Sequence, residues 1–278
     1  MEVIVAKTAG FCFGVKRAVE KVYANVDKEH VYTYGPIIHN EQVVADLEKH
    51  GVRVVEEDTD LTQLPEGTII VRAHGASRAE FDRLRECGMQ IEDATCPFVS
   101  KIYRIVEEES KAGRTVIIVG NAAHPEVRGI RGWSGKDTYV VGSIEEANNL
   151  NILAKNISIV SQTTFNLKKF KEIVEIFEKK GYDIKCLNTI CNATEVRQTE
   201  ARQIASQVDA MIVIGGKNSS NTQKLFEICK EECSNTYYIQ TAEDLDYTAI
   251  RGMQRIGITA GASTPKNIIE EVQTRCQI

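Results

Sequence analysis

The sequence predicts an α/β fold made of three similar small βα domains with mainly parallel sheets. Short β-branched segments alternate with helical patterns along the whole chain, which is typical of parallel α/β proteins. The pattern recurs three times with a period of about ninety residues, which is too long for a solenoid and suits a small domain. With 278 residues, 42% of them hydrophobic and 26% charged, the chain can bury a sizeable core.

The individual elements follow from local patterns. β-Branched runs bounded by glycine or polar residues predict strands at 3–6, 31–34, 68–73, 115–120, 157–162, 210–216 and 255–261. Apolar residues at helical spacing predict helices at 15–24, 41–50, 78–86, 101–111, 167–180, 195–206 and 265–275. Several strands end in a glycine or polar turn directly before the next helix, which is where open α/β sheets usually bind ligands.

One cysteine opens each repeat, in the segments GFCFG, DATCP and TICNA. Each is followed at a nearly constant interval by a glycine that ends a strand; these pairs are Cys12 and Gly35, Cys96 and Gly120, and Cys191 and Gly215. The repeats predict domains at 13–95, 96–190 and 191–278. Three similar domains pack most simply around a pseudo-threefold axis with equivalent loops at its centre, although repetition alone also permits a linear array.

Composition excludes several classes of protein. The net charge of −5, without a basic block, argues against nucleic-acid binding. No apolar run approaches the length of a membrane helix, and the N-terminus lacks a signal-peptide pattern. We therefore expect a cytoplasmic protein without a membrane partner.

The eight cysteines divide into two groups. Cys12, Cys96 and Cys191 share one place at a predicted helix N-terminus, where the helix dipole and free N–H groups favour thiolate. The other five are interpreted as packing or incidental residues: Cys87, Cys186, Cys229, Cys233 and Cys276. No CxxC pair occurs, which argues against zinc ribbons and thioredoxin-like sites.

Three converging thiolates lack the fourth ligand of a structural zinc site, whereas they suit a [4Fe–4S] cluster with one open iron. The open iron could act as a Lewis acid on a substrate oxygen. The alternative is that the three cysteines are buried structural residues, repeated because the helix start is repeated.

Polar side chains recur in the loops after the predicted strands. His39, His124 and the pair Ser219–Ser220, with Asn221 beside it, follow their cysteines at similar intervals, and His74, Thr163 and Ser263 lie in the last turn of each repeat. Imidazole, hydroxyl and helix N-terminal N–H groups together suit a phosphate or diphosphate. Neither a dinucleotide-binding glycine motif nor a P-loop occurs.

Glu126 stands two residues after His124 in one of these loops. A carboxylate screened from water could hold or deliver a proton near neutral pH. The alternative is a first-turn acid that stabilises a helix N-terminus behind Pro125.

Nine segments in order along the chain resemble one family. They read GFCFGVKRA, GPIIHNEQV, AHG, DATCPFV, HPEVRG, SQTT, CNAT, NSSN and GAST. Together they resemble the LytB family of 4-hydroxy-3-methylbut-2-enyl diphosphate reductases, which complete the methylerythritol phosphate route to isoprenoids. The match runs from near the N-terminus to near Thr264, and the joint set is highly specific.

The resemblance implies a trefoil of three α/β domains around a central iron–sulfur cluster, with residues 1–12 adding the N-terminal strand to the third domain. It implies one [4Fe–4S] cluster held by Cys12, Cys96 and Cys191. It also implies single-electron delivery by ferredoxin or flavodoxin, in agreement with the lack of flavin or nicotinamide motifs in the chain.

The resemblance further implies the substrate site. The diphosphate would be held by His39, His74, His124, Ser219, Ser220, Asn221 and Ser263. Thr163 would lie beside the substrate hydroxyl, and Glu126 would supply protons, with His124 as a candidate relay. Two electrons and two protons would remove the hydroxyl as water and give isopentenyl and dimethylallyl diphosphate.

Two other functions fit parts of the pattern. One is a non-catalytic binding protein for a phosphorylated metabolite, with three structural cysteines. The other is a hydro-lyase of the dehydratase type, with the same open iron and no net redox change. The binding protein predicts that Cys12→Ser leaves ligand binding and fold unchanged, and consumption of a reduced dye with substrate distinguishes the reductase from the hydro-lyase.

Overall fold

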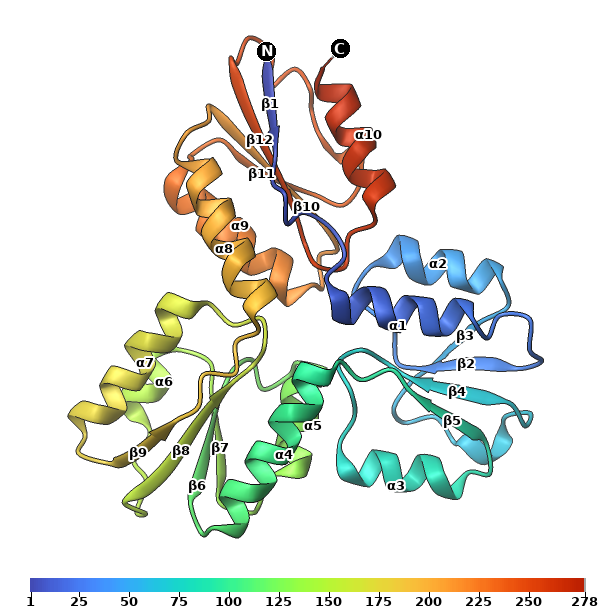
Figure 1. Ribbon diagram of the computed structural model, residues 1–278, viewed down its shortest axis with the longest axis vertical. Helices are drawn as coiled ribbons and strands as arrows, with labels where there is room; N and C mark the ends of the chain where they lie inside the picture. Colours follow the sequence, from blue (N-terminus) through green and yellow to red (C-terminus); the bar gives the residue numbers. More distant parts are fainter. Residues whose placement is uncertain (278) are drawn as a thin grey trace. The chain divides into compact units, whose positions relative to one another are not determined.

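The computed structural model describes residues 1–277 (Figure 1). These residues divide into two compact units. Unit 1 contains Met1–Lys16, Ile38–Ala45 and the chain from Asn192 onward. Unit 2 contains Arg17–Ile37 and Asp46–Cys191. The expected end of the third domain, Ile278, lies outside the described residues. The three-domain division stays a prediction.

Unit 1 is built on one parallel four-stranded sheet. Its strands, in spatial order, are β1 (Glu2–Val5), β12 (Arg255–Ala260), β10 (Ala210–Ile214) and β11 (Thr236–Ile239). The N-terminal strand pairs in parallel with β12, with Glu2 opposite Arg255. The first residues of the chain are therefore fixed to a sheet whose other strands lie after residue 209.

Helices cover both faces of this sheet because its central strand is apolar on both sides. Along β10, Ile212 and Ile214 pack with the buried residues of α10 (Lys266–Cys276). Met211 and Val213 alternate with them and pack toward α8 (Asn192–Ala205) and α9 (Ser220–Glu232). Figure 1 shows α8 and α9 on one side of the sheet and α10 on the other. The short helix η2 (Ala242–Asp244) follows β11.

Unit 2 contains two further parallel sheets. The first has the order β3 (Arg53–Val55), β2 (Val31–Tyr34), β4 (Thr68–Val71), β5 (Gln90–Asp93). The second has the order β7 (Thr138–Val141), β6 (Thr115–Val119), β8 (Asn156–Ser161), β9 (Asp183–Cys186). The central strands β2, β4 and β6 are fully buried, as expected when helices cover both faces of a parallel sheet.

The helices of unit 2 are α3 (Arg78–Glu86), α4 (Pro97–Lys111), α5 (Pro125–Trp133), α6 (Ile144–Asn149) and α7 (Leu167–Lys179), with the short helix η1 (Leu61–Gln63). On the second sheet, α7 packs on one face and α4 and α5 pack on the other. On the first sheet, Phe81 and Leu84 of α3 pack against β2 and β4. Two helices, α1 (Phe13–Tyr23) and α2 (Glu41–Lys49), begin in segments of unit 1 and end in segments of unit 2.

All three sheets share one strand order. In each, the first strand of the repeat lies between the second and the third, and the outer place beside the third is taken by β5, β9 or β1. In doubly wound sheets with connections of this kind, ligands usually bind at the carboxyl ends of the first and third strands. The predicted class, three parallel βα sheets, is confirmed. Their arrangement around a common axis stays a prediction.

Candidate functional site

The three repeat-equivalent cysteines have the same backbone setting. Each is the last residue before a helix, α1, α4 or α8. Each donates its N–H to a carbonyl in the turn after a third strand: Cys12 to Ala262 at 3.2 Å, Cys96 to Ala73 at 2.9 Å and Cys191 to Thr163 at 3.1 Å. None of the three forms a disulfide bond within residues 1–277, and all are partly exposed. A thiolate at such a place gains from the helix N-terminus and is accessible to a metal.

The other five cysteines have different surroundings. Cys87 ends α3 and donates its thiol to the Leu84 carbonyl at 2.8 Å. Burial raises the pKa of the Cys229 thiol to about 12 and the pKa of the Cys276 thiol to about 11. Cys233 is buried, and Cys186 is exposed on the short strand β9. These differences agree with the expected packing or incidental roles.

Two histidines of unit 2 lie against each other. His74 is in the turn after β4, and His124 is the residue that caps α5. Their rings are 5.2 Å apart between centroids and nearly perpendicular, at 85°. The backbone N–H of Glu126 donates to Nδ1 of His124 at 3.1 Å. A neutral His124 ring therefore carries its proton on Nε2, where it can be donated to an anion.

Glu126 is a buried acid whose carboxylate accepts two hydrogen bonds from Thr163. It is 2% exposed. Thr163 donates its N–H to Oε1 at 2.6 Å and its hydroxyl to Oε2 at 2.8 Å. Burial raises the pKa of the Glu126 carboxyl from 4.5 to about 7, although both bonds from Thr163 act to lower it. Protonated and ionised forms therefore coexist near neutral pH, as a proton donor requires.

The structure shifts the expected equivalence of the last turns by one residue. In each turn, a backbone N–H donates to the carbonyl three residues earlier. These bonds run from Gly75 to Arg72, from Phe165 to Gln162 and from Thr264 to Gly261. They align His74 and Ser263 with Thr164, and they align Thr163 with Ala73 and Ala262. Thr163 thus supplies a hydroxyl where the other two repeats have a methyl group. The polar pair of Thr163 and Glu126 is consequently specific to one repeat.

In unit 1, three predicted residues gather at the start of α9. Ser219 caps the helix, with its hydroxyl accepting from the N–H of Thr222 at 3.3 Å. Ser220 and Asn221 are the next two residues of the chain. Asn221 is 5% exposed, and its amide Nδ2 has no hydrogen-bond partner among residues 1–277. A buried amide donor without a partner indicates a place for a ligand acceptor.

His39 and Ser263 lie together in the same unit. The Ser263 hydroxyl donates to the His39 carbonyl at 3.1 Å. Gly216 allows this approach, since a Cβ there would lie 2.7 Å from the same carbonyl oxygen. Unit 1 therefore fixes the backbone of His39 at the carboxyl ends of β10 and β12.

The twelve predicted site residues divide equally between the units. Unit 1 contains Cys12, His39, Ser219, Ser220, Asn221 and Ser263, and unit 2 contains His74, Cys96, His124, Glu126, Thr163 and Cys191. Each group occupies strand ends and helix starts within its own unit. The convergence of the two groups on one centre stays a prediction.

Sequence reasoning missed Tyr103, which supports the histidine turn of unit 2. Its hydroxyl donates to the His74 carbonyl at 3.2 Å, and its ring stacks on Trp133 at 5.3 Å between centroids. Trp133 in turn donates its indole N–H to the Ala76 carbonyl at 3.0 Å. Tyr103 lies two helical turns after Cys96, on the buried side of α4. No local pattern of the sequence specifies this contact between distant parts of the chain.

Comparison with known proteins gives one consistent result. A family model described as LytB protein matches residues 3–277. The chain is 49% identical to the 4-hydroxy-3-methylbut-2-enyl diphosphate reductase of Caldanaerobacter subterraneus, over 98% of this chain and 95% of the relative. It is 47% identical to the enzyme of the same name from Geobacter sulfurreducens, over 100% and 97% of the two chains.

Solved structures agree with the sequence comparison. The structure of the E-1-hydroxy-2-methyl-but-2-enyl-4-diphosphate reductase from Plasmodium falciparum matches with a TM-score of 0.93 and 29% identity, covering 99% of this chain and 87% of that one. A second reductase structure, described as the terminal enzyme of the non-mevalonate pathway, matches with a TM-score of 0.69 and 42% identity over 100% and 99% of the chains. None of the helices within residues 1–277 has the length and apolar character that a membrane crossing requires.

Proposed function

This chain belongs to the LytB protein family, and we propose that it removes the hydroxyl of 4-hydroxy-3-methylbut-2-enyl diphosphate by a two-electron, two-proton reduction. The carbon–oxygen bond breaks, the oxygen leaves as water, and the second proton adds to the allylic chain. The products are isopentenyl and dimethylallyl diphosphate, at the end of the methylerythritol phosphate route to isoprenoids. The enzyme is thus an oxidoreductase.

The cofactor assigned here is one iron–sulfur cluster on Cys12, Cys96 and Cys191. Three partly exposed thiols, each directly before a helix, form a donor set that fits such a group. When bound, a [4Fe–4S] cluster with three cysteine ligands supplies electrons and one iron with an open position.

The diphosphate is assigned to hydrogen-bond donors of both units. They are His39, Ser219, Ser220, Asn221 and Ser263 in unit 1, and His74 and His124 in unit 2. Two observations support this assignment: the partnerless Nδ2 of buried Asn221 and the Nε2 proton of neutral His124. Both are donors suited to phosphate oxygens.

Proton delivery is assigned to Glu126, and its buried carboxyl is the observation that carries the proposal. The protonated acid sits 2.8 Å from the Thr163 hydroxyl. Thr163 can turn its hydroxyl proton from Oε2 to the departing substrate oxygen, pass that proton on, and take a replacement from the protonated Oε2 of Glu126, so the hydrogen bond between them reverses. Burial raises the pKa of the acid, so that part of it stays protonated near neutral pH, and excludes water that would compete for the proton. A relay through His124 stays a prediction.

The electron donor in this proposal is an external one-electron protein, ferredoxin or flavodoxin, and the location is cytoplasmic. Neither nucleic acid nor a membrane takes part. An external donor fits a chain that carries no flavin or nicotinamide motif.

Metal analysis tests the cofactor assignment. Protein purified without oxygen should contain about four irons and four acid-labile sulfides per chain, with an absorbance band that the Cys96→Ser variant loses. One zinc per chain with no sulfide would remove the cluster from the proposal.

A further inference from the structure

Glu57 joins the two elements of unit 2 that carry His74 and His124. It lies in the connection after β3, and its side chain is 29% exposed. Its Oε1 accepts from Nη2 of Arg72 at 2.5 Å and from Nη2 of Arg128 at 2.5 Å. One carboxylate oxygen therefore bonds two arginines from different parts of the chain.

Arg72 connects Glu57 to the turn of His74. Its side chain is 5% exposed, and its Nε donates to the Gly75 carbonyl at 3.3 Å, directly after His74. A buried guanidinium requires a charged partner, because removal from water penalises an isolated ion. The partner is Glu57. Gly35 makes room for this arginine, since a Cβ there would lie 2.2 Å from Nη1.

Arg128 connects Glu57 to the helix of His124. It lies one turn into α5, and its backbone N–H donates to the His124 carbonyl at 3.0 Å. Its side chain is 49% exposed. The contact with Glu57 therefore fixes the first turn of α5, where His124 is the capping residue.

The backbone of Glu57 is itself held in place. Arg83 of α3 donates to the Glu57 carbonyl, and the same guanidinium donates to the Tyr34 hydroxyl at 2.8 Å. The backbone of Glu57 is thus tied to α3 and β2, while its carboxylate bonds Arg72 and Arg128.

We propose that Glu57 is a positioning residue that sets the spacing of His74 and His124 for the diphosphate of the substrate. The proposal rests on the proposed function, in which both imidazoles bind diphosphate oxygens. With the rings 5.2 Å apart between centroids, small movements of the turn or of α5 change which oxygens both rings can reach. The single negative charge of the carboxylate also offsets one of the two arginine charges, which reduces their competition with the histidines for the diphosphate.

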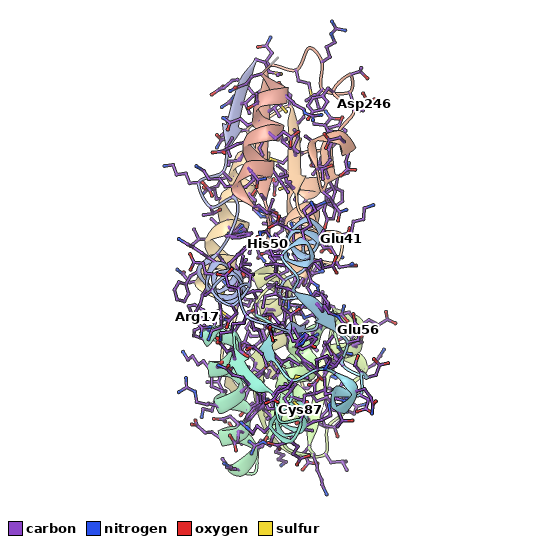
Figure 2. The ribbon with its side chains drawn as sticks, turned by 90° about the vertical axis from the view of Figure 1, so that its right-hand side faces the viewer. Arg17, Glu41, His50, Glu56, Cys87 and Asp246 are labelled. Atoms are coloured by element: carbon purple, nitrogen blue, oxygen red, sulfur yellow. The ribbon has the colours of Figure 1, made fainter. Side chains whose placement is uncertain are left out.

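The test compares Glu57→Gln with Glu56→Gln in cluster-loaded protein. Glu56 is the adjacent acid and is exposed (Figure 2). Its side chain makes no hydrogen bond or ion pair within residues 1–277. Binding of inorganic pyrophosphate is measured by calorimetry without oxygen, well below the melting temperature, together with kcat and KM for the allylic diphosphate. We expect Glu57→Gln to weaken pyrophosphate binding and raise KM by about tenfold or more, with a smaller change in kcat. Glu56→Gln should match the wild type.

Two further variants keep the test decisive. Arg128→Gln removes the half-exposed contact and leaves the buried pair of Glu57 and Arg72. This variant should therefore fold even if Glu57→Gln does not. It should also weaken pyrophosphate binding. In a His74→Asn background, Glu57→Gln should weaken pyrophosphate binding by a smaller factor than in the wild type, because Glu57 acts through that histidine.

The inference is overturned if a folded Glu57→Gln variant, or Arg128→Gln, binds pyrophosphate as tightly as Glu56→Gln does. Tighter binding in Glu57→Gln or in Arg128→Gln would also overturn it. If the wild type neither binds pyrophosphate nor turns over, the proposed function fails instead.

Discussion

Replacing Glu126 by glutamine removes the proton that the proposed reaction needs, while the replacement keeps the size of the side chain. The glutamine carbonyl can still accept from the Thr163 N–H, and its amide can donate to the Thr163 hydroxyl, in place of the bonds at 2.6 and 2.8 Å. General acid catalysis typically contributes about 10²–10⁴-fold to a rate. We therefore expect kcat to fall by about that factor, with the cluster content and the affinity for pyrophosphate unchanged.

The same substitution changes how stability depends on pH. A pKa raised from 4.5 to about 7 for the Glu126 carboxyl corresponds to about 3 kcal/mol between its two protonation states. Because the folded-state pKa is the higher one, the native protein keeps a proton that the unfolded chain has lost between these values. The contribution of this carboxyl to the free energy of unfolding is fully present below pH 4.5 and is lost as the pH rises through about 7. Glu126→Gln should lack this decline.

The assay follows the protonated carboxyl by infrared difference spectroscopy, with Glu126→Gln as the reference, beside kcat across the same pH range. The carboxyl band should be half lost near pH 7, and wild-type kcat should fall above that pH because the acid form is the donor. A band already lost by about pH 5, where an ordinary carboxyl has titrated, would refute the buried-acid reasoning. Near-normal turnover of the variant would remove Glu126 from the proton path.

Three further predictions concern the cysteines, the threonine and the N-terminal loop. Cys96→Ser should lose most iron and sulfide while Cys87→Ser keeps both, as measured by metal analysis; equal content in the two would contradict the ligand assignment. Thr163→Val removes a bond that lowers the pKa of the carboxyl, so the infrared midpoint should move upward, and an unchanged or lower midpoint would count against that bond. Glu200→Gln replaces a carboxylate that accepts from the N–H groups of Lys7 and Thr8, and hydrogen exchange of these two amides should accelerate about tenfold; unchanged exchange would show that Glu200 does not hold the loop.

Much of the fold could be predicted because its signals are local. The buried strands β2, β4, β6, β8, β10 and β12 are β-branched runs between turn residues, and all were expected. The strand β5 (Gln90–Asp93) was not expected, because a short edge strand with the sequence QIED carries little apolar pattern. Helix α4 begins at Pro97, before the expected residue 101, because proline is favoured in the first turn of a helix.

The site was predictable to the extent that it repeats. The repeat placed Cys12, Cys96 and Cys191 directly before helices, and the motifs gave the family and the class of enzyme, both of which are confirmed. The one-residue shift at Thr163 was not visible, because loops of different composition can be aligned only by their backbone bonds. The contacts of Glu57 and Tyr103 join distant parts of the chain, and no local pattern specifies them.

Counting electrons during turnover tests the central claim most directly. Purified protein, a reduced viologen dye and 4-hydroxy-3-methylbut-2-enyl diphosphate are mixed without oxygen, and the dye oxidised is compared with the isopentenyl and dimethylallyl diphosphate formed. We expect two dye molecules to be oxidised for each product molecule, because each dye molecule supplies one electron. Loss of the substrate hydroxyl without dye oxidation, or dye oxidation without either product, would contradict the claim.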